Sequence, residues 1–189
     1  MLLKRGFLFG EASRMNGKRG QVWVETVIYT LIAFALMGLV LAFVVPKIEE
    51  TQDKGIIEQS VGVLQDIDSL IRNLGGPGNQ RTPEIGLNKG SLTIDGINDT
   101  IFFTIESKYQ YSQPGEAINI GKIVVNTEEQ GEDNIVTLTL DYSGQYNLTH
   151  EDKEEEKVLT RAPTPYRVLI SNKGVDGAGN SLINLEVVG

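Results

Sequence analysis

Three successive patterns of hydrophobic and polar positions divide this chain. Residues 26–45 form an uncharged, mostly apolar run of 20 residues. At about 1.5 Å per helical residue, such a run covers the roughly 30 Å hydrocarbon core of a bilayer. After Pro46 the apolar positions recur every three or four residues, which is the period of an amphipathic helix. These positions are Ile56, Ile57, Val61, Val63, Leu64, Ile67, Leu70, Ile71 and Leu74.

The first two patterns together predict one long helix over about residues 21–74. Pro46 lacks an amide hydrogen, so we expect it to kink this helix. The sequence Gly-Gly-Pro-Gly at residues 75–78 predicts its end, because glycine adopts the positive φ of a helix C-cap and proline cannot continue the helix.

From Ser91 onward the apolar period is two, which predicts strands. The segments rich in β-branched and aromatic residues are 91–97, 101–110, 117–126, 135–142, 166–172 and 182–188. The clearest alternation places Val136, Leu138, Leu140 and Tyr142 on one face. We therefore expect an α+β protein, in which a long N-terminal helix packs on the antiparallel β-sheet of a head domain.

Turn residues separate the predicted strands. Asp95-Gly96 and Asp176-Gly177 predict tight turns, and residues 128–133 predict a solvated hairpin loop. The charged run 151–157 predicts a surface loop.

Charge is distributed unevenly along the chain. The first 20 residues carry five basic residues and Glu11, a net charge of +4, which leaves −12 for the rest of a chain whose total is −8. Positive charge before the first apolar segment predicts a single-pass membrane precursor with its N-terminus in the cytoplasm and its head outside the cell. An acidic head also argues against nucleic-acid binding, since phosphates would repel it.

These patterns predict four regions. They are a basic leader at 1–20, a hydrophobic membrane or assembly helix at 21–46, its amphipathic continuation at 47–76, and an extracellular β-rich head at 77–189. Translation starting at Met15 in place of Met1 would still leave a short basic leader, and the sequence does not choose between them.

The head offers little for catalysis. It has one histidine, His150, and no cysteine, so we expect no enzyme activity and no catalytic residues. Loops 128–133 and 176–180 contain oxygen donors for Ca²⁺, but neither has the EF-hand ligand spacing. Turn formation is the simpler interpretation of both loops, and we expect no metal and no cofactor.

Two Asn-x-Thr sequences begin at Asn98 and Asn147. In a head outside the cell, both asparagines are candidate acceptors for N-linked glycans.

The most specific pattern lies just before the apolar run: Lys18, Arg19, Gly20 and Gln21, followed by Glu25. It resembles the class III signal peptide of archaeal type IV pilin-like proteins. The resemblance implies that Lys18 and Arg19 are recognised in the leader, and that a membrane prepilin peptidase cleaves between Gly20 and Gln21.

The resemblance covers about thirty residues, and two positions depart from it. Trp23 replaces the small polar residue usual at the third mature position, and Tyr29 replaces the leucine usual at the ninth. Beyond this stretch the resemblance is architectural, a long helix carrying a β-rich head.

Glu25 has a physical role that is consistent with this resemblance. Cleavage would leave a free ammonium on Gln21, which is costly to bury unless a carboxylate lies nearby. Glu25 is one helical turn away and can neutralise the amine of its own chain or of a neighbour, which would fix the register of packed helices. The simpler alternative is an uncleaved signal anchor with Glu25 at the level of the lipid headgroups.

The expected function is therefore that of a structural subunit, a pilin or pilin-like protein of an extracellular type IV pilus-like filament. Adhesion or surface attachment is the expected role, and DNA or protein traffic is the alternative that the sequence leaves open. The resemblance implies as partners other copies of the chain, the membrane before assembly, the prepilin peptidase, an assembly ATPase and a membrane platform. The mature form would lie in a cell-surface filament. The alternative is a monomeric extracellular binding module on an uncleaved anchor, which does not polymerise.

Overall fold

The computed structural model describes residues 17–188, with side chains from Val22 onward. The leader residues 1–16 lie outside the described residues. The chain divides into two compact units: the first ends at Val45, and the second is Pro46–Gly189.

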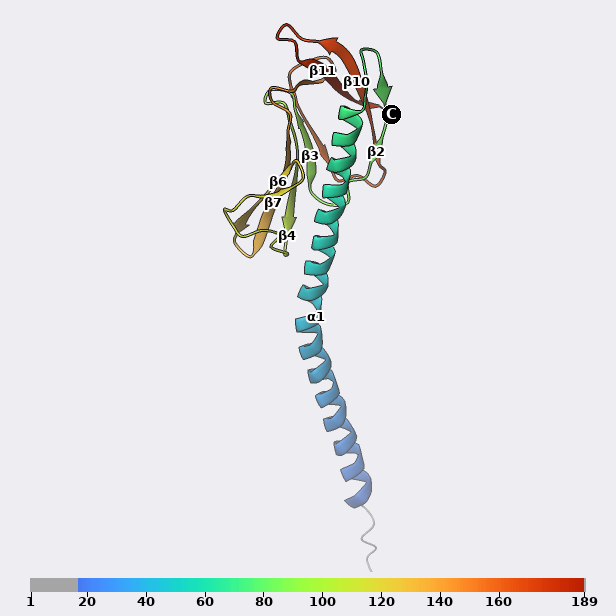
Figure 1. Cartoon of the computed structure of the whole chain (residues 1–189). Coiled ribbons are helices and arrows are strands. Elements are labelled where there is room, and N and C mark those ends of the chain that lie inside the picture. Colours follow the sequence, from blue (N-terminus) through green and yellow to red (C-terminus); the bar gives the residue numbers. More distant parts are fainter. Residues whose placement is uncertain (1–16, 189) are drawn as a thin grey trace, which may run out of the picture. The chain divides into compact units, whose positions relative to one another are not determined.

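The predicted long helix is present as α1 (Gly17–Arg72), which has 56 residues and includes Pro46 (Figure 1). It ends two residues before the predicted Leu74. Gly75 follows with φ of +80°, as expected for a glycine after a helix C-terminus. The Asn172 side chain donates a 2.7 Å hydrogen bond to the Gly75 carbonyl and so ties this end to a strand. The kink at Pro46 stays a prediction.

The strands form two sheets in the second unit (Figure 1). The first, sheet A, has the order β1-β10-β11-β8, and β2 also pairs with β10. Its members are β1 (Gln80–Arg81), β2 (Glu84–Ile85), β8 (Tyr146–His150), β10 (Tyr166–Val175) and β11 (Ser181–Val188). Every pair in sheet A is antiparallel except β8 with β11, which is parallel.

Sheet B is antiparallel throughout, with the order β5-β6-β7-β4-β3-β9. Its members are β3 (Ser91–Asp95), β4 (Thr100–Ser107), β5 (Ile118–Ile120), β6 (Ile123–Gln130), β7 (Asp133–Asp141) and β9 (Glu156–Thr160).

The α+β class and the antiparallel-rich head are therefore as predicted, but a single antiparallel sheet is wrong. The predicted strand 117–126 is two strands, β5 and β6, because Gly121 turns the chain at φ of +64°. Strands β1, β2, β8 and β9 were not predicted. The first two have only two residues each, and β9 begins within the charged run that we expected to be all loop.

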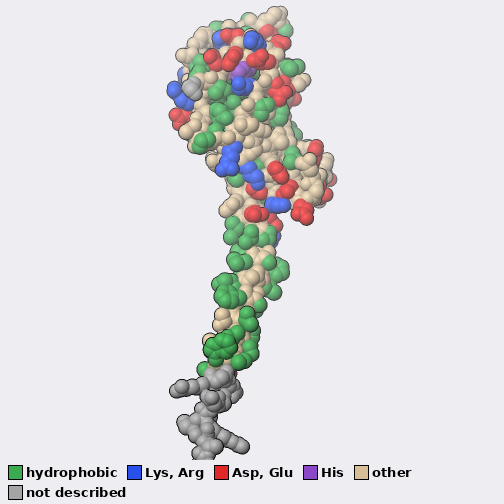
Figure 2. Space-filling model, turned by 180° about the vertical axis from the view of Figure 1, so that it is seen from behind, with side chains coloured by type: hydrophobic (Ala, Val, Ile, Leu, Met, Phe, Trp, Pro, Cys, Tyr) green, Lys and Arg blue, Asp and Glu red, His purple; other side chains and the backbone are tan. Residues whose placement is uncertain are grey.

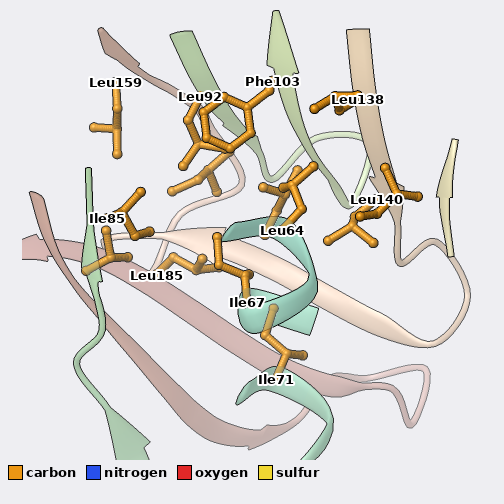
Figure 3. Close-up of a cluster of buried hydrophobic side chains, with 14 of the residues drawn as sticks. Leu64, Ile67, Ile71, Ile85, Leu92, Phe103, Leu138, Leu140, Leu159 and Leu185 are labelled. Carbon is orange, nitrogen blue, oxygen red and sulfur yellow. The ribbon is translucent and has the colours of Figure 1, made fainter. Parts of the chain in front are cut away.

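One hydrophobic core joins the second half of α1 to both sheets. Leu64 and Ile67 of the helix lie between side chains of the two sheets (Figure 3), among them Leu185 of sheet A and Leu140 of sheet B. The predicted inward face of residues 135–142 is confirmed: Val136, Leu138 and Leu140 of β7, and Tyr142 directly after it, are all at most 1% exposed.

Two buried carboxylates also fasten α1 to the sheets. Asp53 pairs with the Lys89 ammonium and accepts a 2.7 Å hydrogen bond from the Lys108 amide. Asp68 pairs with Arg72 and accepts a 3.3 Å hydrogen bond from the Tyr142 hydroxyl. Both aspartates are 5% exposed, so these partners compensate for the cost of burying a charge.

Candidate functional site

The apolar segment, residues 22–45 of α1, is the strongest candidate for a functional surface. Every side chain in it is exposed, including Trp23, Phe34 and Phe43. Figure 2 shows hydrophobic side chains covering this part of the helix, whereas acidic and basic side chains occur over the second unit. Among the described residues, α1 is the one helix long and apolar enough to cross a membrane. A continuous apolar surface of this size marks a site that lipid or protein covers.

The two threonine hydroxyls in the first part of this segment are hydrogen-bonded within the helix. The Thr26 hydroxyl donates to the Val22 carbonyl at 2.9 Å, and the Thr30 hydroxyl donates to the Thr26 carbonyl at 2.8 Å. Such bonds to the preceding turn let threonine enter an apolar environment without an unpaired donor. Glu25 is exposed, and no hydrogen bond or ion pair joins it to the side chains that the structure describes from Val22 onward.

The predicted processing residues belong to the start of α1. Lys18, Arg19, Gly20 and Gln21 are helical in the uncut chain, and their side chains lie outside the described residues. The Gln21 nitrogen, which cleavage would free, precedes Glu25 by four positions and therefore by about one helical turn. The helix thus places the two groups of the predicted ion pair on the same side.

Charge returns abruptly after the apolar segment. Lys47 and Glu50 form a 2.6 Å ion pair, and Lys54 lies 3.8 Å from Glu58. Both pairs are largely exposed, so each contributes little to stability. Between Glu25 and Lys47 there is no charged residue, a span of about 33 Å at 1.5 Å per residue. This length suits the hydrocarbon core of a bilayer.

The two predicted glycan acceptors differ in accessibility. Asn98 is exposed in the β3–β4 turn, where Asp95 accepts hydrogen bonds from its amide and side chain. Asn147 lies in β8, and its side-chain oxygen is buried without a hydrogen-bond partner. Asn98 is therefore the better acceptor of the two.

The turn predictions around Asp95 and Asp176 are confirmed. Asp176 accepts hydrogen bonds from the amides of Ala178 and Asn180 at 2.9 and 2.8 Å and closes the β10–β11 hairpin. The hydrogen bond from the Asn180 amide, more than any other, lowers the pKa of Asp176. Its carboxylate is thus used by the turn itself.

A cavity of about 530 Å³ lies beside Asp53 in the second unit. Its lining mixes acidic and basic side chains, and two of the cations already have partners: Lys89 with Asp53, and Lys108 with Asp133. The hydrogen bond to Asp133 raises the pKa of Lys108. These two ion pairs are internal to the protein and contribute to its structure.

The buried aspartates Asp53 and Asp68 were not predicted from the sequence. A signal for them exists: both fall on the apolar stripe of α1, in phase with Ile57, Val61 and Leu64. A carboxylate at a core-facing helical position predicts a buried partner, because an unpaired buried charge is costly.

Comparison with protein-family models, with curated proteins and with solved structures gives no match to this chain.

Proposed function

We propose that this chain is a structural subunit of an extracellular type IV pilus-like filament. The observation that carries the proposal is the apolar segment, whose side chains are all exposed although the second unit has a complete core of its own. A surface of this kind needs a cover, which the bilayer supplies to the precursor and sister helices supply in the filament.

Glu25 gives this surface its specificity. An uncharged segment would pack against lipid or other helices in many registers, since apolar contact is non-directional. One carboxylate and one amine per subunit, both in an apolar environment, must meet each other because an unpaired charge there costs several kcal/mol. Glu25 of one subunit and the freed Gln21 amine of a neighbour then select a single stagger.

The remaining parts of the proposal follow from the order of the chain. The leader with Lys18 and Arg19 stays in the cytoplasm, a prepilin peptidase cuts between Gly20 and Gln21, and an assembly ATPase with its membrane platform extracts the subunit. The second unit then forms the filament surface, with adhesion or surface attachment as its role.

Processing is the first test. We expect intact-mass measurement of the protein from native membranes to give a mature chain that begins at Gln21. Replacing Gly20 by a bulky residue should trap the precursor, because the peptidase must accommodate the residue before the cut bond. A protein that retains its leader while functional would support the uncleaved, monomeric binding module instead.

Assembly is the second test. Glu25→Gln keeps the size of the side chain and removes its charge, so we expect normal processing and loss of filament incorporation. Glu49→Gln is the matched control, since it makes the same change at an exposed position of the same helix beyond the apolar segment. Normal filaments from Glu25→Gln would refute the role of Glu25 in register.

A further inference from the structure

The turn between β8 and β9, residues 150–155, brings the single histidine of the chain close to two carboxylates. His150 is the last residue of β8, and Glu151 and Glu155 lie in the turn that follows. Ligand atoms of these three residues all lie within 4.8 Å of one another. His150 Nδ1 is 3.4 Å from a carboxylate oxygen of Glu155.

His150 is buried without a hydrogen-bond partner. It is 2% exposed, and neither Nδ1 nor Nε2 has a partner among the described residues. A neutral imidazole carries one donor and one acceptor, and nearly all buried polar atoms in folded proteins are paired. The unpaired imidazole nitrogens of His150, beside two carboxylates, are the observation that points to a ligand.

The protein holds the first half of this turn firmly. His150 and Lys153 exchange two backbone hydrogen bonds of 2.9 Å, and Glu151 and Asp152 between them both have positive φ. This is the geometry of a tight two-residue hairpin turn. The Asp152 amide also donates a 2.8 Å hydrogen bond to the Asn184 side chain on β11. The backbone that carries Glu151 is therefore fixed next to His150 before any ligand arrives.

The second half of the turn is held by a close backbone contact. The Gly96 amide donates a 3.1 Å hydrogen bond to the Glu155 carbonyl. A Cβ at position 96 would lie 2.9 Å from the Leu148 carbonyl oxygen and 3.1 Å from that of Glu155, so only glycine allows this approach. The backbone of Glu155 is thereby fixed opposite His150.

We propose that His150, Glu151 and Glu155 bind a divalent transition-metal ion, for which Zn²⁺ is the probe. One imidazole nitrogen and two carboxylates form a donor set typical of Zn²⁺. Ca²⁺ and Mg²⁺ prefer oxygen ligands alone and would leave the imidazole nitrogen unused. No metal was predicted from the sequence: the loops considered for Ca²⁺ were 128–133 and 176–180, and the run 151–157 after His150 was expected to be a charged surface loop.

The ion would connect the two sheets. His150 ends β8 in sheet A, and Glu155 directly precedes β9 in sheet B. The chain has no cysteine, so no disulfide can strengthen this crossover. A ligand that binds the folded state and not the unfolded chain adds to stability, so the ion acts as a clip between the sheets. This role does not depend on filament assembly.

Thermal unfolding of the full chain in detergent tests the proposal. We expect saturating Zn²⁺ to raise the Tm of the second unit by at least about 3 °C. Glu151→Gln and Glu155→Gln should each abolish most of this shift, and both residues are exposed enough for the variants to fold. Glu156→Gln, an exposed neighbour outside the cluster, is the matched control with the same charge change and should keep the full shift.

Cobalt spectroscopy provides a second readout that does not depend on stability. One equivalent of Co²⁺ should give visible absorption bands of a nitrogen- and oxygen-ligated ion in the wild type and in Glu156→Gln, and His150→Gln should lose them. An equal Tm shift with Ca²⁺ or Mg²⁺, a Zn²⁺ shift that survives Glu155→Gln, or no Zn²⁺ shift in the wild type would each overturn the proposal.

Discussion

The substitution of leucine by alanine at two positions of α1 tests which part of the helix stabilises the second unit. Leu64 is fully buried between the two sheets (Figure 3), whereas Leu36 is 59% exposed in the apolar segment. Replacing either by alanine removes three carbon atoms and favours the helix slightly, since alanine has the higher helix propensity. Any loss must therefore come from the surroundings of the side chain.

The expected magnitudes differ sharply. At about 0.8 kcal/mol per buried carbon, Leu64→Ala loses roughly 2.4 kcal/mol of transfer free energy, and the cavity left in the core adds to it. We expect a total of about 3 kcal/mol, within the range of about 2–5 kcal/mol for such sites. Leu36→Ala removes no core contact, so the free energy of unfolding of the second unit should stay within about 0.5 kcal/mol of wild type.

Hydrogen exchange measured by mass spectrometry or NMR on the full chain in detergent reports these changes. The amides of Phe103 and Leu138, which face each other across β4 and β7, are suitable probes. A loss of about 3 kcal/mol makes their exchange roughly a hundredfold faster, because each 1.4 kcal/mol is about a factor of ten. Leu36→Ala should leave this exchange unchanged and reduce filament yield instead.

Two outcomes would refute this reasoning. Exchange in Leu64→Ala less than about threefold faster would mean that α1 does not contribute to the core as the structure has it. Comparable acceleration in Leu36→Ala would mean that the apolar segment belongs to the same folding unit as the sheets.

Three further predictions concern the second unit. Tyr142→Phe removes the hydroxyl that donates a hydrogen bond to the buried Asp68 carboxylate, and it should cost about 1–2 kcal/mol of unfolding free energy. Since burial raises the pKa of Tyr142, wild-type stability should be constant below the ordinary tyrosine pKa of about 10 and fall as pH rises above it. A pH series of denaturant titrations should show less of this alkaline loss of stability in the variant. Glycopeptide mass spectrometry should find glycan on the exposed Asn98 before Asn147, and exclusive occupancy of Asn147 would contradict the accessibility argument. Gly90→Ala should destabilise the protein by at least about 1 kcal/mol, because position 90 has φ of +77° and a Cβ there would collide with a β4 carbonyl. Gly86→Ala is the control: its Cβ would meet nothing within 4 Å, so the same denaturant titrations should show almost no change in stability.

Much of the fold was predictable from local patterns. The spacing of apolar residues predicted the long helix, the change to strands near Ser91 and the inward face of β7. It could do so because a helix buries every third or fourth residue and a strand every second. The predicted turns at Asp95 and Asp176 also hold, since their side chains bond amides only two to four residues away. Interactions within a few residues leave a signal in the sequence.

The apolar segment and Glu25 were likewise determined by the sequence alone. An uncharged run of this length is long enough to cross a bilayer, and its length and composition are visible without the rest of the fold. The structure adds that the side chains of residues 22–45 are exposed within their own unit.

Only the tertiary structure decided how distant residues meet. The division into two sheets, the parallel pairing of β8 with β11 and the partners of Asp53 and Asp68 join positions far apart in the chain. The same holds for His150: the sequence identified it only as the single histidine, next to a charged run, whereas the structure shows a buried imidazole beside two carboxylates. Burial depends on which strands pack over a residue, and local periodicity contains no information about that choice.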